Sequence, residues 1–124
     1  MSTLSFHDRA KLLLCASLLA VSSFAQAGEI KMLMRDMKLA MQGAMASTTM
    51  PALSSYVARL ERDVEQVSHQ PYRDDQPTYD EGMQALRREL VDVDQAIRAN
   101  DMTTAKNALR RIDGTRKHYH DLLG

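Results

Sequence analysis

Four stretches of the sequence carry apolar residues at the spacing of an α-helix, and none shows the alternation of a strand. A helix that is apolar along one stripe must bury that stripe against other elements, so the pattern predicts an all-α fold. The stripes are Ile30, Leu33, Met34, Met37, Met41 and Met45; Leu53, Val57, Leu60, Val64 and Val67; Met83, Leu86, Leu90, Val93 and Ile97; and Met102, Ala105, Leu109, Ile112, Arg116, Tyr119 with His120, and Leu123.

Capping and turn residues indicate where these helices begin. The first helix is expected over about 29–45. The second starts near Pro51, which suits a first helical turn because its missing N–H would be unpaired there. The third is expected to start with a capping box over 78–81 (TYDE), in which Thr78 is the N-cap. The fourth follows Asn100-Asp101, a turn and N-cap pair.

The connections between these helices predict their topology. The segment from Ser68 to Pro77 holds two prolines and two adjacent aspartates, so it is expected to be a loop. The other two connections are short, and short connections make neighbouring helices antiparallel. The sequence therefore predicts an antiparallel up-down-up-down four-helix bundle.

The first 27 residues are typical of a secretory signal peptide. Arg9 and Lys11 precede the apolar run LLLCASLLAVSSF, which has the length of a signal core and is short for a membrane span. Ala25-Gln26-Ala27 is the small-x-small pattern after which signal peptidase cleaves. We therefore expect residues 1–27 to be removed on export and residues 28–124 to form one domain.

Cysteine usage and charge narrow the possible functions. The single cysteine, Cys15, lies in the apolar run and leaves with the signal. The domain is therefore expected to fold without a disulfide and to attach nothing through a thiol. Lys and Arg together number 16, as do Asp and Glu, and this balance gives no sign of a nucleic-acid or anionic-membrane partner.

The predicted topology brings two potential iron ligands to one end of the bundle, where the first helix starts and the fourth ends. At about 1.5 Å of rise per residue, Met34 lies about 9 Å from the mature N-terminus and His120 about 6 Å from the C-terminus. Helical phase puts His120 on the inward stripe with Arg116, and it turns His118 about 200° away, toward water. A thioether and an imidazole that face each other in an apolar bundle can hold a haem iron from both sides.

Each of these residues also has an ordinary structural interpretation. A methionine stripe at helical spacing is more often core than ligand. A histidine in a last helical turn is more often a solvated group favoured by the helix dipole. Met34 and His120 are expected at similar depth, on inward faces and at the same end of the bundle. This agreement favours the interpretation that they are ligands without deciding it. Because Cys-x-x-Cys-His is absent from the sequence, any haem is expected to be held non-covalently.

Residues 28–124 resemble the soluble cytochrome b562 family of periplasmic four-helix-bundle proteins with a b-type haem. The best local match is Thr115-Arg116-x-x-Tyr119-His120, which is similar to the segment that ends in the family's haem-ligating histidine. The family's methionine ligand is the seventh residue of the mature chain, and counting from Gly28 that residue is Met34. By this resemblance Met34 and His120 are the axial ligands. Arg116 either lies beside the haem edge or a propionate, or is a surface arginine whose stem covers apolar atoms.

The resemblance implies a periplasmic electron-transfer protein that binds one haem b (iron protoporphyrin IX) non-covalently. It also implies a monomer that exchanges electrons with periplasmic redox partners and carries no membrane segment after signal cleavage. The residues themselves show no nucleophile–base pair, metal-carboxylate cluster or phosphate loop. We therefore do not expect an enzyme.

Two other functions remain open on the sequence. Soft thioethers suit Cu(I), and Met34, Met37, Met41 and Met45 lie on one side of a helix, so a copper-binding bundle is one alternative. The other is a haem-free periplasmic binding or adaptor bundle. Colour discriminates the haem protein from both alternatives, because only a haem protein would be red with a sharp reduced spectrum.

Cleavage after Ala27 gives the first testable prediction. The intact mass of protein recovered from the periplasm should correspond to a chain that starts at Gly28, because the cleavage pattern lies directly before that residue. A mass that includes Cys15 would contradict the signal-peptide interpretation.

Overall fold

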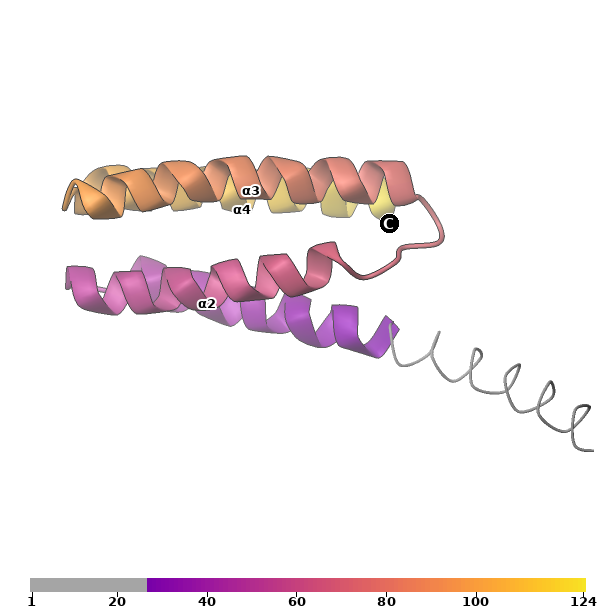
Figure 1. Cartoon of the computed structure of the whole chain (residues 1–124), viewed down its shortest axis with the longest axis horizontal. Coiled ribbons are helices and arrows are strands. Elements are labelled where there is room, and N and C mark those ends of the chain that lie inside the picture. The colour runs from indigo at the N-terminus through magenta and orange to yellow at the C-terminus, as the bar shows by residue number, and fades with distance from the viewer. Residues whose placement is uncertain (1–26) are drawn as a thin grey trace, which may run out of the picture.

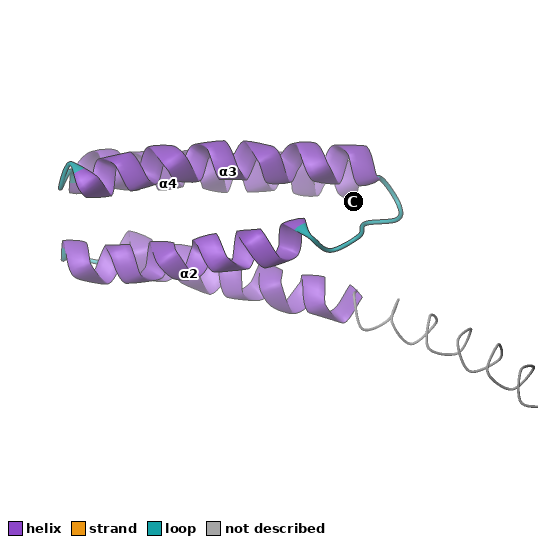
Figure 2. Ribbon diagram, viewed as in Figure 1, coloured by secondary structure: helices purple, strands orange, loops and turns teal. Residues whose placement is uncertain are grey.

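The computed structural model describes residues 27–124, which form four helices with short connections (Figures 1 and 2). The N-terminal helix covers 27–46, and three helices follow it: α2 (Met50–Ser68), α3 (Gln76–Arg98) and α4 (Met102–Leu123). No strand occurs within this range. The prediction of a four-helix bundle is therefore confirmed, while nearly all of the proposed signal peptide lies outside the described residues.

The helices run alternately up and down. Figure 1 shows the described start of the N-terminal helix and the end of α4 at the same end of the bundle, where the loop between α2 and α3 also lies. The opposite end carries the two tight connections at 47–49 and 99–101. Asn100 has a φ of 53°, a left-handed conformation that asparagine tolerates better than most residues, so the chain can reverse there within three residues.

Side chains cap the helices that follow these two tight turns. The Thr49 hydroxyl accepts a hydrogen bond from the backbone N–H of Ala52 at 3.4 Å, and Pro51 lies in the first turn of α2 as expected. Asp101 accepts a hydrogen bond from the N–H of Thr104 at 3.0 Å, so the predicted N-cap of the fourth helix is confirmed.

The predicted start of the third helix is wrong. α3 begins at Gln76, and its N-cap is Asp75, whose carboxylate accepts a hydrogen bond from the N–H of Thr78 at 3.2 Å. Thr78 therefore lies inside the first turn and caps nothing through its hydroxyl. Pro77 is compatible with the earlier start, because a first-turn residue needs no N–H. The loop is correspondingly shorter and covers only 69–75.

The core runs the length of the bundle and draws on all four helices. Its largest fully buried members each contribute about 1.5–3 kcal/mol through the apolar surface they remove from water. The N-terminal helix instead buries Ala40 and Ala44 completely, and these small side chains allow close approach of its neighbours. The most deeply buried large side chains are Tyr79, Leu53, Leu60, Leu109, Ile112, Val57, Val64, Val67 and Val93.

A buried carboxyl lies where the N-terminal helix meets α2. Asp63 is 8% exposed, and its Oδ2 has no hydrogen-bond partner. Burial, together with the neighbouring Asp36 carboxylate, raises the pKa of Asp63 to about 7. Asp36 itself accepts hydrogen bonds from Arg59, which hold its pKa well below the usual range. Below about pH 7 the pair therefore carries one negative charge, which lies on Asp36.

Within the described residues, no helix combines the length and the apolar character that crossing a bilayer requires.

Two glycines in helix interiors should respond oppositely to the same substitution. A Cβ on Gly114 would meet nothing within 4 Å, so Gly114→Ala should raise the free energy of unfolding by about 1 kcal/mol through helix propensity. A Cβ on Gly82 would lie 2.9 Å from Cγ of Tyr119, at the root of that side chain. Because of this overpacking, the free energy of unfolding of Gly82→Ala should be about 1–3 kcal/mol lower than that of Gly114→Ala, as measured by urea denaturation. Equal stability of the two variants would contradict the close α3–α4 contact.

Asp63 should make the protein less stable as the pH rises from about 4 to about 7. Over this interval the folded protein keeps a proton that an unfolded aspartate, with a pKa of 3.8, has lost, so the free energy of unfolding falls as the pH rises. Asp63→Asn removes this loss and should raise the stability at about pH 8 by about 1–3 kcal/mol. Denaturation at about pH 5 and about pH 8 measures the effect, with the exposed Asp92→Asn as control. An unchanged pH slope in D63N would contradict it.

Candidate functional site

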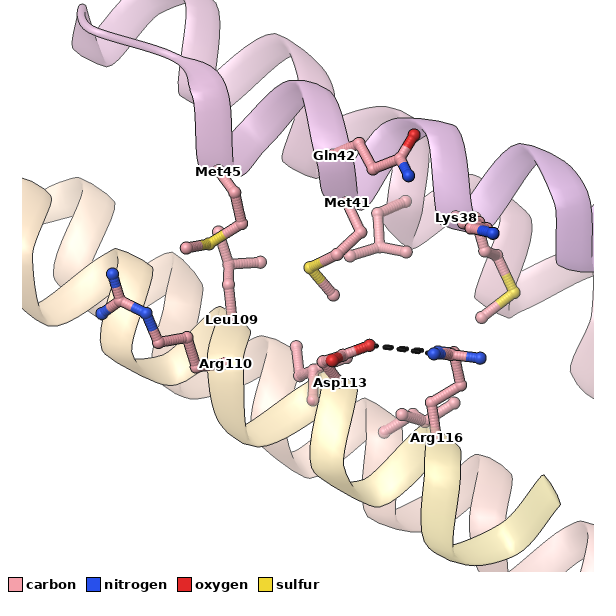
Figure 3. Close-up of a pocket in the computed structure, with 12 residues that line it drawn as sticks. Lys38, Met41, Gln42, Met45, Leu109, Arg110, Asp113 and Arg116 are labelled. Atoms are coloured by element: carbon pink, nitrogen blue, oxygen red, sulfur yellow. Dashed lines mark hydrogen bonds and ion pairs between the residues drawn. The ribbon is translucent and has the colours of Figure 1, made fainter. Parts of the chain in front are cut away.

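The N-terminal helix and α4 face each other across two adjoining cavities. The end cavity, of about 260 Å³, lies where the N-terminal helix starts and α4 ends. The middle cavity, of about 360 Å³, lies further along the same two helices (Figure 3). Both are bordered by Met37, Leu86 and Arg116, so they adjoin, and we call the two together the crevice.

Both proposed iron ligands line the end cavity. Met34 is half-buried on the N-terminal helix, and His120 lies on the facing part of α4. The backbone carbonyl of His120 accepts a hydrogen bond from the N–H of Gly124 at 3.0 Å, so the helix continues past the imidazole. His120 is nevertheless exposed to solvent, which differs from the inward position predicted for it.

His118 lies on a different side of α4. It is exposed, it does not line the end cavity, and its ring makes an edge contact with the ring of Tyr119 at a centroid distance of 5.1 Å. It borders a shallow depression on the α3 side of the helix instead. The two histidines are therefore separated by helical phase, and only His120 shares a cavity with Met34.

Two stacked tyrosines form a wall of the end cavity that the sequence analysis did not identify. The rings of Tyr72 and Tyr79 are parallel within 2°, with centroids 5.1 Å apart. Tyr79 is fully buried, donates its hydroxyl to the carbonyl of Val67, and has its pKa raised to about 12 by burial. The Tyr72 hydroxyl donates to the carbonyl of Leu123 at 3.3 Å. Tyr79 lies four residues before Met83, so extending the third stripe by one turn would have revealed it.

Gly82 and Met83 complete this wall on α3. Gly82 is buried, and the lack of a side chain lets α3 approach the ring of Tyr119 closely. Met83 is 7% exposed and lies beside Tyr79 in the lining. The end cavity thus combines thioethers, aromatic rings and an imidazole in an apolar space, a set that suits a flat apolar cofactor with a soft metal centre.

Arg116 lies at the border of both cavities. Its Nε and Nη2 donate to Oδ1 of Asp113 at 3.2 and 3.1 Å (Figure 3). These bonds are the main reason why the pKa of Asp113 lies below its usual value, and the nearby Lys117 lowers it further. The Arg116 side chain is half-buried, a position that agrees both with a group at the haem edge and with a surface arginine whose stem covers apolar atoms.

The methionine stripe of the N-terminal helix follows the crevice beyond Met34. Met37 is buried and lines both cavities, whereas Met41 and Met45 are half-buried and direct their sulfur atoms toward α4 in Figure 3. Within residues 27–124, no group of three or more His, Cys, Asp or Glu side chains could hold a metal ion. The potential metal ligands around the crevice are therefore thioethers and the imidazole of His120.

Comparison with known proteins agrees with this arrangement. The family model described as Cytochrome b562 matches residues 29–123, which is nearly the whole of the described chain. No curated protein and no solved structure matches the sequence. The family consists of haem-binding electron carriers with a b-type haem and not typically of enzymes. Since the match spans all four helices, the chain belongs to the cytochrome b562 family.

Proposed function

We propose that residues 28–124 form a periplasmic electron-transfer protein that binds one haem b non-covalently, with Met34 and His120 as its axial ligands. The observation that carries the proposal is that these two side chains, from opposite ends of the chain, line one apolar cavity. A Met/His pair is typical of electron-transfer cytochromes and raises the reduction potential of the iron. The residues around the cavity fit such a group in polarity and ligand type.

The haem, when bound, supplies reversible one-electron exchange at its iron. The protein supplies two ligands fixed on packed helices, so neither has to move far when the charge of the site changes. Tyr79 and Met83 exclude water from the cavity wall, which makes the environment of the metal less polar. Arg116 contributes a positive charge at the cavity border, where it would lie beside the haem edge or a propionate.

The remaining parts of the proposal concern attachment, location and assembly. Residues 28–124 contain no cysteine, so a thioether link to haem is impossible. The signal-like first 27 residues support export to the periplasm, where partner proteins would deliver and remove electrons. We propose a monomer that binds neither nucleic acid nor, after signal cleavage, a membrane.

Three substitutions test the ligand assignment through the visible spectrum. His118→Ala should preserve a six-coordinate, low-spin spectrum, because His118 lies outside the end cavity. His120→Ala should give a high-spin or haem-free protein, since one axial bond is lost. Met34→Leu keeps a similar volume but removes the sulfur, so it should lower the reduction midpoint or weaken haem binding without unfolding the bundle.

The two histidine variants serve as each other's control, because both remove an exposed imidazole from the end of α4. Circular dichroism of each variant separates ligand loss from unfolding. A low-spin spectrum in His120→Ala together with a high-spin spectrum in His118→Ala would show that the ligand assignment is wrong.

A further inference from the structure

The crevice is bordered by positive charge, although the chain as a whole has a formal net charge of +0. Lys38 lines the middle cavity from the N-terminal helix, and Arg110 and Arg116 line it from α4 (Figure 3). Asp113 is the one acidic side chain that lines either cavity, and Arg116 and Lys117 both pair with it. The walls therefore carry more cations than anions.

The same charge continues along the outer edges of the two helices. Lys31 lies two turns before Lys38 and so shares its side of the N-terminal helix. Lys106 donates to the carbonyl of Ser47 at 2.7 Å, which places it on the side of α4 that faces the N-terminal helix. We call this set the basic rim; its members are Lys31, Lys38, Lys106, Arg110, Arg116 and Lys117.

Basic and acidic residues are distributed unevenly among the four helices. The N-terminal helix and α4 together carry eight Lys and Arg against four Asp and Glu, whereas α2 and α3 together carry five against eight. Among residues 27–124, no ion pair involves Lys31, Lys38 or Arg110. Positive charge is thus concentrated on the two helices that border the crevice.

We propose that the basic rim is the docking surface for an acidic patch on the protein that exchanges electrons with this one. This inference rests on the proposed function, since it concerns transfer of one electron between the partner's redox centre and the bound haem, one being oxidised as the other is reduced. Three members of the rim also form cavity walls, so a partner on the rim lies directly against the crevice. Complementary charge at such a surface raises the association rate and falls off as salt screens it.

Small redox ions of opposite charge can report the local potential at the crevice. The ferrous, haem-loaded protein is mixed with hexacyanoferrate(III), a trianion, or with tris(phenanthroline)cobalt(III), a trication, between about 0.01 M and about 1 M salt. The oxidation rate with the trianion should fall about tenfold or more across this range, and the rate with the trication should rise. If a near-neutral protein had no local excess of positive charge, its oxidation rate would depend little on the salt concentration with either ion.

Two charge reversals assign the effect to the rim. Arg110→Glu should reduce the salt dependence with the trianion by clearly more than Arg98→Glu does. Both replace an exposed helical arginine with the same change in net charge, but Arg98 lies in the last turn of α3, away from the cavities. If the protein binds haem but its oxidation rates respond equally to both substitutions, the docking role of the basic rim is wrong, while the proposed haem function stands. A protein without haem absorbance would contradict the proposed function, and with it this role of the rim.

Discussion

The packing of the N-terminal helix opposite α4 brings together the two ends of residues 27–124, and the candidate site depends on this contact. Met34 lies near the start of the domain and His120 near its end, so only the antiparallel arrangement brings them to one cavity. The tight turns at 47–49 and 99–101 enforce that arrangement, because they leave no length for a crossover. Capping by Thr49 and Asp101 fixes where α2 and α4 begin, and thus which residues reach the crevice.

The side chains of the N-terminal helix differ in size according to the side they face. Ala40 and Ala44 are fully buried in the core, whereas Met41 and Met45 are half-buried and line the middle cavity. Alanine permits close helix approach on the core side, and the unbranched thioethers adapt to an irregular space on the other. The crevice therefore opens directly onto core side chains, among them Leu60, Leu109 and Ile112.

Much of the fold followed from the apolar periodicity of the sequence, and the errors have identifiable causes. The four helices and their antiparallel order are determined by stripes and turns that are local in sequence. The start of α3 was missed because Asp75 and Thr78 can both act as N-caps, and only the folded chain shows that Asp75 does so. Tyr72 was missed because it lies in a loop, where periodicity gives no information. The exposure of His120 depends on where the neighbouring helices end, which helical phase cannot supply.

The hydrogen bond between Tyr72 and the carbonyl of Leu123 has a consequence for the chain end. Terminal turns of helices open locally at a small fraction of the free energy of global unfolding, and His120 lies in such a turn. Tyr72 attaches this turn to the loop at 69–75, and its ring stacks on the fully buried Tyr79. Under the proposed function, the lifetime of the bound haem should therefore depend on fraying of this turn, and a chain cut after His120 would lose the bond from Tyr72 while keeping Met34 and His120.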